Sequence, residues 1–215
     1  MVKNIAIKSS FLQDLETRKR LKDLNLHELW NLILVKNFFK NIKSLSAKKL
    51  KDIYFNQKIT HLGIGKEQYL RHPLRMAIFC KKYFPNSLSR LYITILFHNI
   101  LEVGNFKEKE IITLLGKDFL NNIKILTINR NKQNNMKYLK NYYSMIIKNK
   151  DCFLVKIIDK YDNLFDLNKN NDNAVKKSYI QEIENFISPN LKNTELFEKA
   201  FIQNLDYNKK IIYEQ

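Results

Sequence analysis

Glycine and proline are scarce in this chain of 215 residues, which contains four glycines and three prolines. Because these two residue types mark turns and interrupt regular elements, their scarcity argues against a fold with many tight turns. It favours an ordered, helix-rich globule. The length and the hydrophobic content of 45% predict one domain, or one domain with an appendage, that is large enough to bury a core.

Cysteine is equally rare, with only Cys80 and Cys152 present. Both lie in apolar helical stretches without the spacing of a metal site, so we expect two reduced, buried side chains and no disulfide framework. The first ten residues lack the apolar region and the cleavage site of a signal peptide. No apolar run reaches the roughly 18 residues that a membrane span needs. We therefore expect a cytoplasmic protein with no membrane partner.

Arginine is the third scarce residue type, although the formal net charge is +17. Nucleic-acid surfaces usually combine arginine with clustered basic and aromatic residues, whereas the lysines here are spread evenly along the chain. Nucleic acid is therefore not the expected primary partner. The positive field still favours an anionic ligand.

Apolar residues recur at helical spacing along most of the chain, and no segment with the period of a strand is long enough to predict one. The fold class that we predict is all-α. We expect residues 1–46 to form an N-terminal helical extension and residues 47–215 to form the main domain. The expected helices span residues 11–43 (as one or two helices), 47–55, 74–84, 91–103, 107–116, 118–127, 138–148, 151–167 and 175–213 (divided at Ser188-Pro189).

The expected helix over residues 91–103, LYITILFHNILEV, is almost wholly apolar and therefore buried, but three polar residues lie near its end. These are His98, Asn99 and Glu102. Buried polar groups need partners, and His98 and Glu102, four residues apart, share one face of a continuous helix. A core histidine that is hydrogen-bonded to a neighbour accounts for this stretch as well as a functional site does.

His72 stands directly before Pro73 and an apolar helical run. Proline is favoured at the first position of a helix, so we expect His72 at or just before a helix N-terminus, from which its side chain can project into a cleft.

The apolar stretch 154–167 carries polar side chains among its isoleucines. Asp159 falls within the buried stripe, and Asn163 lies one turn beyond it on the same side. A buried aspartate needs a cation, a network of donors or a metal. Asp162 and Asp166 are also four residues apart, but we expect them to point elsewhere, as ordinary surface acids can.

Three separate helices thus each deliver one metal-competent side chain, namely His72, His98 and Asp159. Two imidazoles with one or two oxygen ligands suit Mn²⁺, Fe²⁺ or Zn²⁺. Such a metal makes a water molecule a usable nucleophile near neutral pH.

Four segments in this order resemble the HD-domain metal-dependent phosphohydrolases, in particular the RelA/SpoT-type hydrolase domain and the small single-domain alarmone hydrolases of the metazoan SpoT homologue type. The segments are GKEQYLRHPLRMA, LFHNILE, EIITLLGKDFLNNIKILT and VKIIDKYDNLFDLN. The resemblance covers residues 47–205. It implies an HD-domain-like helical bundle and a (p)ppGpp 3′-pyrophosphohydrolase type of activity with a divalent metal, Mn²⁺ above all.

The resemblance also implies roles for individual residues. His72, His98 and Asp159 match metal ligands, and Asn99 stands where the family has its metal-binding aspartate. Glu102 matches the acid that positions or activates the attacking water.

The substrate implied by the resemblance is a phosphorylated purine nucleotide. Asn163 matches an asparagine that helps to hold the nucleotide. Lys66, Arg71 and Lys160 fall near positions at which the family places basic side chains around the substrate.

Three departures from the family pattern separate this chain from an ordinary member. Asn99 can ligate a metal through its amide oxygen, but it brings no negative charge, so metal binding is weakened, or absent if Asn99 does not ligate. Val103 replaces the second acid of a Glu-Asp pair and cannot carry a proton. The arginine that stacks on the base is missing around Gly63.

Three functions therefore remain open. The first is an active phosphohydrolase, with altered substrate or reduced activity. The second is a catalytically degenerate HD-domain protein that binds a nucleotide or a partner protein without turnover. The third is a helical scaffold with a satisfied polar core.

Overall fold

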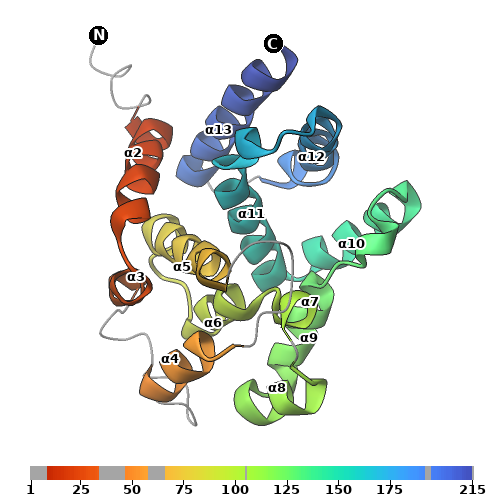
Figure 1. The fold of residues 1–215 in the computed structure, drawn as a ribbon. Helices are drawn as coiled ribbons and strands as arrows, with labels where there is room; N and C mark the ends of the chain where they lie inside the picture. The colour runs from red at the N-terminus through yellow and green to blue at the C-terminus, as the bar shows by residue number, and fades with distance from the viewer. Residues whose placement is uncertain (1–8, 34–46, 58–65, 105, 192–194, 215) are drawn as a thin grey trace. The chain divides into compact units, whose positions relative to one another are not determined.

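The computed structural model describes residues 9–33, 47–57, 66–104, 106–191 and 195–214 (Figure 1). Every regular element in these ranges is helical and none is a strand, which confirms the predicted all-α class. The α-helices are α2 (Ser9–Asp23), α3 (Leu26–Ile33), α4 (Ala47–Phe55), α5 (Lys66–Tyr83), α6 (Ser89–Phe97), α7 (Ile100–Val103), α8 (Glu108–Leu115), α9 (Lys117–Leu126), α10 (Met136–Lys148), α11 (Lys150–Leu164), α12 (Asn173–Phe186) and α13 (Glu195–Tyr213). None of these helices is long and apolar enough to cross a membrane.

The chain forms two compact units. The central unit is Leu26–Lys156, and the terminal unit combines Met1–Asn25 with Ile157–Gln215. The change from one unit to the other after Lys156 falls inside α11, which runs without interruption through that point. The predicted division after residue 46 borders residues 34–46, which lie outside the described ranges, and it stays a prediction.

Side-chain caps fix where several helices begin. The Oδ1 atom of Asn135 accepts a hydrogen bond from the amide of Tyr138 at 3.0 Å, so α10 begins at Met136, two residues before the predicted start. In the same way, Asp172 accepts from the first amides of α12. Asparagine and aspartate are favoured at this position because their oxygens satisfy amides that have no partner within the helix.

The core of the central unit contains an aromatic cluster beneath α3. Leu29, Trp30 and Ile33 lie on one face of α3 and are all buried, as the spacing of three and four residues dictates. The Trp30 ring lies 5.5 Å from the rings of both Tyr54 and Phe55 on α4. Helix α3 also packs against α5, the helix that carries His72.

The terminal unit is held together by α2, α12, α13 and the second half of α11. The two helices α2 and α13 pack against each other although they stand at opposite ends of the sequence, and α12 also packs against α13 (Figure 1). Tyr161 of α11 is fully buried and contacts the rings of Phe197 and Phe201 on α13. The residues around Asp159 therefore lie on a helix with a tightly packed aromatic side.

Both cysteines are free and buried, as the sequence predicted. Burial raises the pKa of the Cys80 thiol to about 12 and that of the Cys152 thiol also to about 12. Neither thiol therefore has the lowered pKa that is typical of a nucleophilic cysteine.

Truncation of α3 on its buried side should be far more costly than truncation on its outer side. Leu29 is 0% exposed and Leu32 is 44% exposed. We expect Leu29→Ala to lower the free energy of unfolding by about 2–5 kcal/mol, whereas Leu32→Ala should change it by roughly 0.5 kcal/mol. Urea denaturation followed by circular dichroism measures both. Equal losses for the two variants would contradict this packing of α3.

Candidate metal centre

His72 lies inside a long helix and not at the start of one. The structure corrects the prediction that a helix begins at Pro73, because α5 begins at Lys66 and includes the proline. Proline removes one helical hydrogen bond and costs about 3 kcal/mol in a helix interior. Burial of Tyr69 and Leu70 ahead of it, and of Leu74 after it, continues one apolar face through the proline and offsets this cost.

His98 and Asn99 divide the predicted single helix over residues 91–103. The structure corrects this prediction too, since α6 ends at Phe97 and α7 begins at Ile100. Asn99 adopts φ −106° and ψ 11°, outside the helical region. Its carbonyl oxygen accepts from the amides of Glu102 and Val103 at 2.9 and 3.0 Å. The two polar residues therefore form a turn between two buried helices.

A backbone contact fixes the His98 imidazole. The ring is buried, and its Nδ1 atom lies 2.7 Å from the carbonyl oxygen of Ile95. A carbonyl can only accept, so Nδ1 carries the proton and the lone pair of the neutral ring is on Nε2. Histidines that bind metals are commonly oriented in this way. The His98 and His72 rings lie 5.4 Å apart at an angle of 69°.

Asp159 lies on α11 and is 6% exposed. Its Oδ1 atom accepts a hydrogen bond of 2.8 Å from the side-chain amide of Asn163, one turn later. This bond fixes the plane of a carboxylate within a buried face, as the spacing of the two residues predicted. The same hydrogen bond gives the side-chain amide of Asn163 a partner even when no ligand is bound.

Three side chains of the described residues can share one cation. His72, His98 and Asp159 each offer a ligand atom, and these atoms lie within 4.8 Å of one another. Two imidazole nitrogens and one carboxylate oxygen are the donor set of a divalent transition metal. The tautomer of His98 suits metal binding, because the hydrogen bond from Nδ1 to Ile95 leaves the lone pair of Nε2 available to a cation. The residues present therefore fit a metal ion.

Asn99 and Val103, the two positions at which we expect departures from the HD-domain motif, differ in their surroundings. Asn99 is half-buried and directly follows His98, so its ligation through the amide oxygen stays a prediction. Val103 is 1% exposed and closes α7. An apolar side chain thus fills the core at this position.

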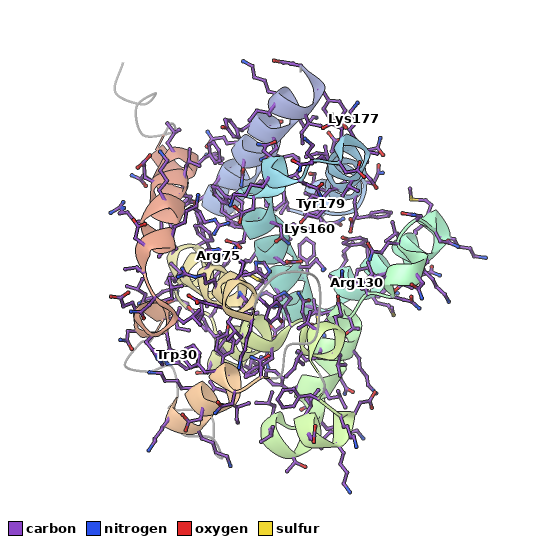
Figure 2. The ribbon with its side chains drawn as sticks, viewed as in Figure 1. Trp30, Arg75, Arg130, Lys160, Lys177 and Tyr179 are labelled. Atoms are coloured by element: carbon purple, nitrogen blue, oxygen red, sulfur yellow. The ribbon has the colours of Figure 1, made fainter. Side chains whose placement is uncertain are left out.

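Glu102 is held by the segment after α9. Its side chain is 7% exposed. Its Oε1 atom accepts from the amide of Ile128 at 3.1 Å, and its Oε2 atom lies 3.3 Å from the guanidinium of Arg130 (labelled in Figure 2). Arg130 is not among the site residues predicted from the sequence. The one signal that could have found it is an arginine within an asparagine- and lysine-rich segment of a chain that has few arginines.

The predicted substrate-binding side chains lie in different surroundings. On α5, Lys66 is exposed, and Arg71 is half-buried with its guanidinium 3.3 Å from Glu67. Lys160 is buried and engaged within the terminal unit: its Nζ atom lies 3.0 Å from Glu182 and 4.0 Å from the centre of the Tyr179 ring (Figure 2). Contact of these residues with a substrate stays a prediction.

Comparisons with known proteins identify a similar fold and no sequence family. No protein-family model matches the chain, and no curated protein matches its sequence. Among solved structures, the chain is similar to a metazoan orthologue of SpoT that hydrolyses ppGpp, with a TM-score of 0.59. The two sequences are 18% identical, and the match covers 79% of this chain and 97% of that one. The similarity shows that this chain has the helical fold of that hydrolase.

Replacement of Asn99 by aspartate should strengthen metal binding. The change is nearly isosteric and adds one negative charge next to His98. Two unit charges 4 Å apart attract by about 4 kcal/mol at an effective dielectric constant of about 20. We therefore expect Mn²⁺ affinity, measured by isothermal titration calorimetry, to rise at least about tenfold.

The matched control is Asn121→Asp, which adds the same charge at an exposed position of α9. It should leave Mn²⁺ affinity unchanged. An Asn99→Asp protein with the affinity of the wild type would mean that the side chain at position 99 does not face the ion.

Proposed function

We propose that this protein is a metal-dependent nucleotide phosphohydrolase of the HD-domain type, which removes the 3′-pyrophosphate from a (p)ppGpp-like purine nucleotide. The observation that carries this proposal is the cluster of His72, His98 and Asp159 ligand atoms within 4.8 Å. Further support comes from the fold, which is that of a ppGpp hydrolase, and from the sequence motifs around these residues.

The three clustered side chains would hold the cation, with Mn²⁺ as the first candidate and Fe²⁺ or Zn²⁺ as alternatives. When bound, a divalent cation activates water as a Lewis acid and offsets the charge of a phosphoryl group. The protein keeps its ligands oriented through the Nδ1 bond of His98 to Ile95 and the bond from Asn163 to Asp159. Outer contacts of this kind tune metal affinity.

In this proposal Glu102 takes the proton from the attacking water. Its carboxylate is oriented by the Ile128 amide and by Arg130. The Arg130 side chain is 42% exposed, so an anionic substrate can attract its guanidinium away from Glu102. Proton acceptance at Oε2 then no longer competes with the ion pair.

Basic residues on α5 are the proposed contacts for the phosphates. Lys66 and Arg71 carry positive charge within two turns of His72 on the same helix. The net charge of +17 raises the local concentration of any polyanionic nucleotide.

A specific observation favours a second candidate, a protein that binds a nucleotide without turnover. Asn99 and Val103 replace two acids of the family motif, and Val103 is packed into the core at 1% exposure. A site with fewer carboxylates holds a metal less tightly and has fewer groups that transfer protons. Binding through the remaining residues would survive these changes.

The deciding experiment is a nucleotide panel with added Mn²⁺. We expect ppGpp to be hydrolysed with release of pyrophosphate, and GDP and GTP to be left unchanged. A nucleotide at 100 times its Kd should also raise Tm by roughly 5–10 °C, because it binds the folded state. The variant His98→Gln should lose hydrolysis, while His27→Gln, the same change at an exposed histidine, should retain it.

The outcomes separate the candidates. Hydrolysis that requires Mn²⁺ and His98 supports the phosphohydrolase. A rise in Tm without hydrolysis supports the second candidate. A panel that produces neither effect, with metal present, contradicts both and leaves a helical scaffold.

A further inference from the structure

The second half of α11 and the turn after it carry three acids close together. Asp159, Asp162 and Asp166 are separated by three and four residues, so they are neighbours along one side of the helix. Asp159 is 6% exposed and Asp162 is 0% exposed. The prediction that Asp162 is a surface acid is therefore wrong. Buried carboxylates so close to one another repel, and each needs a compensating charge.

Arg18 of α2 supplies the compensating charge for two of these acids. Its Nη2 atom lies 2.5 Å from Asp166 and its Nε atom 3.5 Å from Asp162. The arginine is itself buried at 4% exposure, and its guanidinium lies 5.6 Å from the centre of the Phe165 ring. A guanidinium is always ionised and can hold two carboxylates in a fixed geometry. Arg18 thus engages the two acids that are not in the metal cluster.

Further contacts of α2 fix the rotation of the same part of α11. Asp14 is fully buried and accepts a hydrogen bond of 2.5 Å from the hydroxyl of Tyr161. The Phe11 ring stacks on Phe165 with their centres 6.0 Å apart. About two turns of α2 are thereby fixed to the end of α11 and the turn after it by hydrogen bonds, ion pairs and ring contacts at once. A rotation of α11 by one residue would break all of them.

We propose that Arg18 is a positioning residue for the metal centre: it holds the helix that carries Asp159 in the rotation at which that carboxylate faces the cation. This inference rests on the proposed function, since it assumes that Asp159 is a metal ligand. Arg18 lies outside residues 47–205, over which the sequence motifs predict a resemblance to the HD-domain hydrolases. In this proposal α2 thereby contributes to the site.

The test compares two identical substitutions on α2 in the full chain. Arg18→Met removes the buried guanidinium, whereas Arg20→Met removes an exposed one two residues away. Mn²⁺ affinity is measured by isothermal titration calorimetry, and the folded fraction by circular dichroism. We expect Arg18→Met to bind Mn²⁺ about 10- to 100-fold more weakly, and Arg20→Met to bind it as the wild type does.

A second variant covers the case in which Arg18→Met does not fold. The double variant Arg18→Met with Asp162→Asn removes the buried cation together with its buried acid, so no uncompensated charge remains at that pair. It should fold and still bind Mn²⁺ more weakly, because α11 is no longer held. If either folded variant binds Mn²⁺ as tightly as Arg20→Met does, this proposal is overturned. A wild-type protein that binds no Mn²⁺ contradicts the proposed function instead.

Discussion

Burial of charged and polar side chains in a helical core is the constraint on which this structure depends. His98 and Asp159 lie among apolar residues, where an ionised or unsatisfied group is costly. The protein meets this cost with specific contacts: a backbone carbonyl for His98, an amide for Asp159, and a guanidinium for Asp162. These contacts orient the side chains as well as stabilise them. The contacts that stabilise the fold therefore also orient the candidate metal ligands.

Helical periodicity predicted most of the fold, and it failed where tertiary packing overrides a local rule. Proline at position 73 indicated a helix start, but the buried face that runs from Tyr69 to Cys80 keeps the helix continuous. The run that ends at Val103 indicated one helix, but Asn99 caps a second helix at the polar turn. Both errors concern segments that carry candidate ligands. Local preference is weakest where the core has to present polar groups.

The candidate ligands could be found from residue types and motif order, but their supporting contacts could not. Arg18 and Asp166 are 148 positions apart, and Arg130 and Glu102 are 28 apart. No periodicity connects such pairs, because only the folded chain brings them together. The sequence pattern consequently predicts a surface position for Asp162 and gives no role to Arg130. The residues that orient a site are harder to predict than the residues that form it.

The central claim is that His72, His98 and Asp159 bind one divalent cation. The most direct measurement is a crystal structure of the protein grown with Mn²⁺, with anomalous diffraction recorded at the manganese absorption edge. The account predicts one anomalous peak in contact with an imidazole nitrogen of each histidine and with a carboxylate oxygen of Asp159. A fully occupied peak elsewhere, or no peak among these three side chains, would contradict it.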